Sequence, residues 1–293
     1  MRFIARAVLA GACLAAAGAA FAQSAPPPPA SGSDIVVTGR RDQEQQVRDF
    51  VAALTPAENG AIPRFVDQVC AAAVGLLPEQ NDAVAARLKQ VAAGIGLKAA
   101  PDGCTPNAFV VVTESKRAFM EMLAKRRPQT FGFMPPRELR RLAYGPARAA
   151  AWQIAGAVDR KDKPQRYNDI FSGSPSEAWE AVNRARANPR GFDAAVLVIE
   201  MRGVHGLTTI QVADYAAMRL FAHIDPARLP AGSPPTILTA LDAPLGSDVP
   251  VTLTKWDAGF LRGLYASGFN RSTGKQRDQI AGKINQSLET PQP

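Results

Sequence analysis

The run FDAAVLVIEM, from Phe192 to Met201, reads as a strand because its centre is an unbroken series of apolar residues rich in valine and isoleucine. The run AFVVVT, from Ala108 to Thr113, predicts a second strong strand. Before Met201 such runs alternate with amphipathic stretches, and after it the chain is almost wholly helical. Strands followed by helices are typical of α+β domains. We therefore expect an α+β fold, with a mainly antiparallel sheet covered on one side and a helical C-terminal half.

Weaker patterns complete the expected order of elements. Two further strands are predicted at Arg64–Cys70 and Ala150–Ala155. A polar, helix-like stretch covers Asp42–Leu54. The amphipathic helices expected from apolar spacing are Glu79–Ile95, Ser115–Arg126, a short helix opened by Pro135-Pro136 and ending at Tyr144, Thr208–Ala222, Thr236–Leu241, Lys255–Ala266 and Gln276–Leu288. Thr254 and Asp257 form a capping-box pattern at the start of one of them.

The N-terminus has the features of an export signal. Residues 1–22 begin with basic residues, continue through a short apolar run and end at the small-x-small site Ala20-Phe21-Ala22. The apolar run is too short for a membrane-spanning helix, so we expect no transmembrane anchor. Cleavage near Ala22 predicts a periplasmic or secreted protein. Residues 23–41 then form a Pro-rich spacer, and residues 42–293 are expected to be a single α+β domain.

The end of the spacer carries a distinctive octet. Asp34-Ile-Val-Val-Thr-Gly-Arg-Arg41 resembles the short segment near the mature N-terminus of TonB-dependent receptors. Such a resemblance implies docking by strand addition to the exposed edge of a partner's sheet. The rest of the chain lacks the repeated alternating segments of a receptor barrel. The alternatives are a strand that docks on the protein's own sheet, or a disordered tail.

Cysteine usage fits an oxidising compartment. Cleavage near Ala22 removes Cys13 and leaves only Cys70 and Cys104, for which one disulfide is the natural interpretation. It would close a loop of about 35 residues and stabilise the fold by about 3 to 4 kcal/mol in the chain-entropy model. Two separate buried thiols are the alternative.

Charge is concentrated in one segment. The formal net charge of +8 falls by two when Arg2 and Arg6 leave with the signal peptide, and residues 114–148 hold nine basic against three acidic residues. In an exported protein this excess indicates an anionic envelope component or an acidic partner protein, and not nucleic acid. Two solvated helix faces without a partner are the alternative. The candidate binding residues are Lys116, Arg117, Lys125, Arg126, Arg127, Arg137, Arg140 and Arg141.

Catalytic and cofactor motifs are missing from the sequence. His205 and His223 are the only histidines, and H-E-x-x-H, G-x-S-x-G and phosphate-binding glycine loops do not occur. His223 with Asp225 would supply two ligands, whereas a zinc site needs at least three protein groups. We therefore expect no metal and no cofactor.

Residues 192–266 resemble an exported alphaproteobacterial family of unknown function with a degenerate zincin-like domain. The matching order is the Phe192–Met201 run, the helix LTTIQVADY (Leu207–Tyr215), the segment PPTIL and then LTKWD leading to Leu-Tyr. Gln211 stands where the family has Glu, and an amide cannot act as a general base. The resemblance implies a zincin-like scaffold with a vestigial cleft at Gln211, Asp214 and Tyr215.

An ordinary helix face explains the same residues. In that interpretation Gln211, Asp214 and Tyr215 lie on the polar side, while Ile210, Ala213, Ala217 and Phe221 pack inward. The function expected from the sequence is that of an exported, non-catalytic binding or envelope-associated protein. The alternative is a hydrolase whose site would bring Gln211, Asp214, Tyr215, His205 and His223 together. The oligomeric state does not follow from the sequence.

Overall fold

The computed structural model of the chain describes residues 39–56, 62–66, 68–132, 134–154, 191–192, 194–268 and 271–290. The predicted signal peptide, the spacer as far as residue 38 and most of the β-prone octet lie outside these residues. Helix α1 (Arg40–Leu54) begins two residues before the expected domain start, so the last two residues of the octet are helical.

The central sheet has four strands in the order β2-β3-β6-β4. They are β2 (Ala71–Val74), β3 (Ala108–Thr113), β4 (Ala149–Ile154) and β6 (Ala194–Glu200). The β2–β3 and β3–β6 pairs are parallel, and only β4–β6 is antiparallel. The expectation of a mainly antiparallel sheet is therefore wrong, although the broader prediction of a mixed α and β fold is confirmed.

The sequence of β6 shows why the strands run parallel. Six of its seven residues are buried, from Ala194 to Ile199, so the strand has no solvent-facing side. Continuous apolar runs of this kind are typical of parallel strands covered on both faces. Helix α2 (Pro78–Gly94) supplies the crossover between β2 and β3 that a parallel pair requires.

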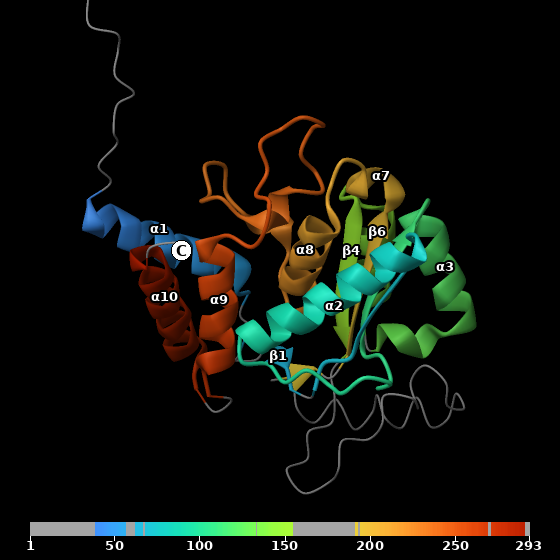
Figure 1. Ribbon diagram of the computed structural model, residues 1–293, viewed down its shortest axis with the longest axis horizontal. Helices are drawn as coiled ribbons and strands as arrows, with labels where there is room; N and C mark the ends of the chain where they lie inside the picture. The colour runs from blue at the N-terminus through green and yellow to red at the C-terminus, as the bar shows by residue number, and fades with distance from the viewer. Residues whose placement is uncertain are drawn as a thin grey trace, which may run out of the picture. The chain divides into compact units, whose positions relative to one another are not determined.

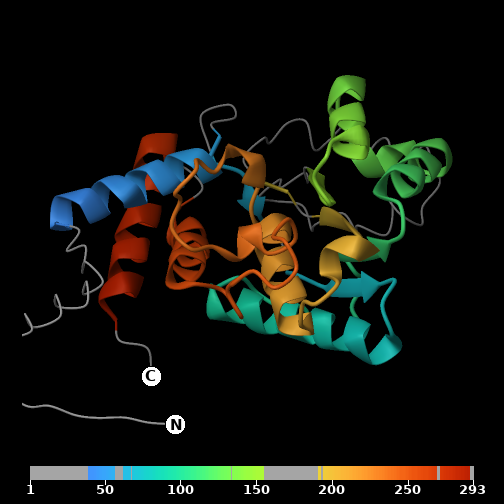
Figure 2. The same cartoon turned by 90° about the horizontal axis from the view of Figure 1, so that it is seen from above.

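Helices cover both faces of the sheet, not one. Helices α2 and α8 (Thr209–Phe221) pack on one face, with the core residues Val110, Leu197 and Ile199 beneath them. Helix α3 (Lys116–Arg126), the 3₁₀ helix η1 (Pro128–Phe131) and α4 (Pro136–Tyr144) cover the other, over the alternate residues of the same strands. Figure 2 shows α2 and the pair α3 and α4 on opposite sides of the strands.

A helical group lies beside the sheet. Helix α9 (Lys255–Ala266) packs against α10 (Thr273–Glu289), and α1 crosses α10 (Figure 1). The capping box predicted at the start of α9 is present, with Thr254 and Asp257 bonding each other's main-chain N–H groups. The edge of the Phe50 ring meets Trp256 and joins α1 to α9.

The remaining elements are short. Strands β1 (Arg64–Phe65) and β5 (Gly191–Phe192) form a separate parallel pair, so only the first two residues of the strand expected at Arg64–Cys70 are extended in a sheet. The other short elements are the helix α7 (Met201–Val204) and the 3₁₀ turns η2 (Pro226–Arg228) and η3 (Ile237–Thr239). The turn η3 lies where the sequence predicts a helix at 236–241. Among the helices that the structure describes, none is long and apolar enough to cross a membrane.

Candidate functional site

The predicted basic segment forms the layer of α3, η1 and α4, but its first member does not face solvent. Lys116 is only 2% exposed, and its Nζ donates to the carbonyls of Gly145 at 3.0 Å and Ala147 at 2.8 Å. Burial lowers the pKa of Lys116. This lysine fastens the start of α3 to the chain that leads into β4, so it cannot contact an external surface.

Two further cations of the segment are neutralised locally. Arg117 pairs with Glu121 at 3.0 Å and lies over the ring of Tyr144. Arg141 pairs with Glu138 at 2.7 Å and with Asp225 at 3.1 Å. The pKa of Arg141 is raised, chiefly by its hydrogen bonds to Glu138. Their charges therefore add little to an outer field.

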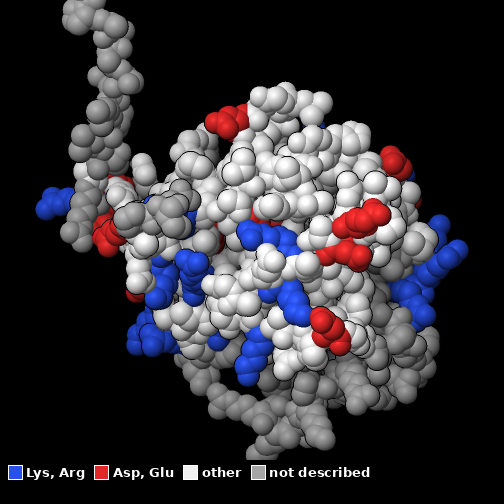
Figure 3. All heavy atoms as spheres, viewed as in Figure 1, with Lys and Arg blue, Asp and Glu red and all other residues white. Residues whose placement is uncertain are grey.

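Five cations of the layer form no close ion pair with a carboxylate of the described residues: Lys125, Arg126, Arg127, Arg137 and Arg140. Lys125 acts on Glu121 at longer range. All are exposed except Arg127, which is half-buried at the C-cap of α3. Figure 3 shows Lys and Arg side chains gathered over α3 at the right-hand edge of the molecule. We call these five residues the cationic layer. It is the part of the predicted patch that can meet an anionic partner.

The face of α8 differs from both interpretations of its sequence. Ile210, expected to pack inward, is 47% exposed, whereas Gln211, Asp214 and Tyr215 are all buried. Gln211 completes the cap of α8 with Thr208 and donates to the carbonyl of Pro250 at 3.0 Å. The helix is buried nearly all round because it lies between the sheet, α2 and the segment at 249–253.

Asp214 lies between three parts of the chain. Its carboxylate accepts from Arg87 on α2, from the Thr252 hydroxyl at 2.6 Å and from the main-chain N–H of Leu253 at 2.8 Å. Every one of these partners is structural. Asp214 therefore has no oxygen presented to a cleft.

Tyr215 and Arg219 form a buried pair one helical turn apart. The Nη1 of Arg219 donates to the Tyr215 hydroxyl at 2.7 Å, and Arg219 itself is 5% exposed. Burial raises the pKa of Tyr215. Arg219 is not among the residues predicted from the sequence, because a cation four residues after Tyr215 does not distinguish a buried arginine from an exposed one.

The two histidines differ in their surroundings, and only His223 is linked to this pair, through Gln153, which donates to the carbonyl of Arg219. His205 is exposed after α7, while the Nδ1 of His223 lies 2.6 Å from the side-chain oxygen of Gln153 on β4. Within the described ranges there is no group of three His, Cys, Asp or Glu side chains placed to hold a metal ion.

A cavity of about 830 Å³ lies between α4, β4, α8 and the segment at 223–243. Tyr215 and His223 line it, but Gln211, Asp214 and His205 do not. The five side chains of the hydrolase alternative are therefore not brought together at this cavity. Its charged lining residues are Lys116, Glu138, Arg141, Arg219, Asp225, Arg228 and Asp242.

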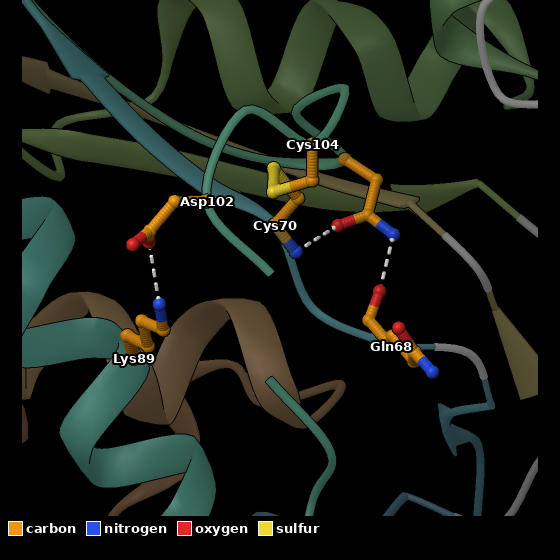
Figure 4. The surroundings of a disulfide bond; sticks show 6 residues. Gln68, Cys70, Lys89, Asp102 and Cys104 are labelled. Carbon is orange, nitrogen blue, oxygen red and sulfur yellow. Dashed lines mark hydrogen bonds and ion pairs between the residues drawn. A yellow bond between two sulfur atoms is a disulfide. The ribbon is translucent and has the colours of Figure 1, made fainter. Parts of the chain in front are cut away.

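The predicted disulfide is present. Cys70 and Cys104 are bonded, with their Cα atoms 6.0 Å apart (Figure 4). The main-chain N–H of Cys70 donates to Asn107, whose side-chain amide donates to the carbonyl of Gln68 at 2.9 Å. The bond ties the start of β2 to the loop before β3, at the edge of the sheet away from β4.

No family model, no curated protein and no solved structure matches this chain. The resemblance of residues 192–266 to a zincin-like family therefore stays a prediction.

Proposed function

We propose that the protein is an exported, non-catalytic binding protein that associates with anionic lipid of the cell envelope through the cationic layer. The observation that carries the proposal is the set of five cations of the α3, η1 and α4 layer that form no close ion pair with a carboxylate of the described residues. Unpaired cations near a surface attract anionic headgroups over about one Debye length, roughly 8 to 10 Å.

Two features support the export half of the proposal. The Cys70–Cys104 bond belongs to an oxidising compartment, because cytosolic thiols are kept reduced. The first 22 residues carry the basic, apolar and small-residue pattern of a cleaved signal. A zincin-like ancestry, with Gln211 replacing the family's glutamate, would explain a scaffold that binds without catalysis.

Vesicle flotation tests the proposal. The mature chain would be mixed with phosphatidylglycerol–phosphatidylcholine vesicles at 0.1 M salt, and a triple variant reversing Arg126, Arg137 and Arg140 to Glu would be compared with it. Each cation near the surface contributes about 1 kcal/mol, so loss of three predicts a fall in affinity of at least about 100-fold.

A matched variant controls for net charge. Lys98, Arg271 and Lys275 are exposed and lie outside the cationic layer, and reversing them changes the charge by the same amount. This control is expected to retain most of its binding. Equal losses in the two triple variants, or binding to pure phosphatidylcholine, would contradict the proposal.

A further inference from the structure

The cavity beside α8 contains two buried cations, of which Arg219 forms no ion pair with a carboxylate of the described residues. Lys116 and Arg219 both line it and are 2% and 5% exposed. Lys116 donates to neutral carbonyls, and the carboxylates of Glu200 and Asp242 act on it. Arg219 donates to a neutral hydroxyl and forms no ion pair in the part of the chain that the structure describes. The Nε of Arg219 is buried without any hydrogen-bond partner. Since a guanidinium keeps its charge, this wall lacks one negative group.

A count of the charges of all the lining residues also shows that one negative charge is missing. Four cations, Lys116, Arg141, Arg219 and Arg228, face three carboxylates, Glu138, Asp225 and Asp242. Glu138 and Asp225 are already paired with Arg141, so they are not available to Arg219. Leaving the histidine aside, the cavity has an excess of one positive charge, which a single carboxylate neutralises.

The cavity also follows β4, which is the edge strand of the sheet among the described residues. The N–H of Glu200 on β6 donates to the carbonyl of Arg148, and the N–H of Ala195 donates to Asn107 beside β3. Because bonded and non-bonded pairs alternate in an antiparallel ladder, Ala149, Ala151 and Gln153 direct their main-chain groups away from β6. These three residues line the cavity.

Small side chains provide room along that edge. Ala149 and Ala151 lie on the side of β4 that faces α8, and the apolar lining also includes Ile224, Leu229 and Leu238. A ligand there meets main-chain donors and acceptors two residues apart, apolar walls and a buried guanidinium. Main-chain hydrogen bonds at a sheet edge are the means by which extended peptides are recognised.

We propose that this cavity binds a short extended peptide, which pairs with the edge of β4 and whose C-terminal carboxylate supplies the missing charge beside Arg219. A volume of about 830 Å³ is within the range of small-ligand pockets. The proposal does not depend on the cationic layer, and either can fail without the other.

Calorimetry with matched probes tests it on the unaltered mature chain. The probes are N-acetyl-Leu-Ala-Val as the free acid, the same peptide as its C-terminal amide, and octanoate. The free acid is expected to bind about 10- to 100-fold more tightly than the amide, because a charge-assisted bond to Arg219 is lost in the latter. It is also expected to bind more tightly than octanoate, which has no peptide groups for β4.

Three outcomes would overturn the proposal without any variant. Equal affinity of acid and amide removes the carboxylate anchor, and octanoate binding as well as the peptide removes the strand pairing. The proposal is also overturned if none of the probes, at millimolar concentration, produces heat or competes with another probe for the protein.

Variants then place the site. Arg219→Gln is expected to lower acid affinity by about 10- to 100-fold and leave amide affinity unchanged. Arg271→Gln, at an exposed arginine outside the lining, is the control and should retain wild-type affinity. A wild-type melting temperature confirms folding, and equal effects of the two variants would contradict the assignment to Arg219.

Discussion

Arg87 and Asp214 join α2 to α8 by two parallel hydrogen bonds, with Nε to Oδ1 at 2.8 Å and Nη2 to Oδ2 at 3.1 Å. Asp214 is fully buried and also fixes Thr252 and Leu253. Removing one charge of a buried pair leaves the other without compensation, which is costly. The residue that could be interpreted as part of a vestigial cleft is therefore a structural junction.

Asp214→Asn is expected to lower the free energy of unfolding by about 3 to 5 kcal/mol, because it leaves Arg87 unpaired and weakens the hold on residues 252 and 253. Urea denaturation measures the change. Asp102→Asn is the matched control, since Asp102 pairs with Lys89 at the surface and its unfolding midpoint should not move. A large loss in the control, or none in Asp214→Asn, would contradict the assignment.

Gly263 sets the spacing of α9 and α10. A Cβ built on it would lie 2.5 Å from the Cα of Ile280, closer than atoms can pack. Gly263→Ala should therefore separate the helices and cost about 1 to 3 kcal/mol. Gly282 lies inside α10 with no atom within 4 Å of such a Cβ, so Gly282→Ala should stabilise by about 1 kcal/mol. Thermal melts of both variants check the opposite signs.

Local patterns in the sequence predict most elements but not their arrangement. Ala108–Thr113 and Lys255–Ala266 have the expected bounds, since apolar spacing and the Thr254–Asp257 cap are local properties. The direction of β6 relative to β3 depends on which strands meet in space. The buried run Ala194–Ile199 contained that information, because a strand without a polar face fits a sheet covered on both sides.

The candidate site, too, could be predicted from the sequence only in part. Counting charges located the basic segment, but composition cannot show that Lys116 is turned inward or that Asp225, 84 residues away, neutralises Arg141. The cavity depends on tertiary contacts between α4, β4 and α8, so its buried Arg219 had no distinguishing signal in the sequence.

Because the fold contains a disulfide, we expect reduction to lower the free energy of unfolding by a large amount. Cys70 and Cys104 are 34 residues apart in sequence, and opening that loop should cost about 3 to 4 kcal/mol in the chain-entropy model. The double variant Cys70→Ala with Cys104→Ala measures this cost by urea denaturation. A thiol count on the denatured mature chain should give no free thiol without reductant. Two free thiols would contradict the bond.

Stability should fall at alkaline pH because of two tyrosines, Tyr215, which is buried, and Tyr265, which is partly buried. Burial raises the pKa of Tyr215 and Tyr265 above their ordinary value of about 10. Tyr265 donates to the carbonyl of Phe221 at 2.6 Å, so its hydroxyl proton is used in the fold. Above pH 10 the unfolded chain loses these protons while the folded chain keeps them, so the stability present below pH 10 is lost as pH rises.

The expected slope is about 1.4 kcal/mol per pH unit for each tyrosine, or about 2.7 for both. Urea denaturation at pH 9.0, 10.5 and 11.0 measures it. Tyr265→Phe should lower the starting stability through the lost hydrogen bond and reduce the slope by about half. A slope unchanged by this substitution would assign the alkaline loss to other groups.

The variant Lys116→Met distinguishes a structural role of the basic segment from a role in binding anionic vesicles. The lysine Nζ serves the carbonyls of Gly145 and Ala147, so its loss should cost about 1 to 3 kcal/mol of stability by leaving buried acceptors unpaired. Because the side chain is buried, vesicle affinity should stay at the wild-type value at temperatures where the variant is folded. Arg140→Met, at an exposed member of the cationic layer, should show the reverse: wild-type stability and affinity lowered by about fivefold. If Lys116→Met lowered vesicle affinity as much as Arg140→Met, the charge of the whole segment would matter and the exposed layer alone would not explain binding.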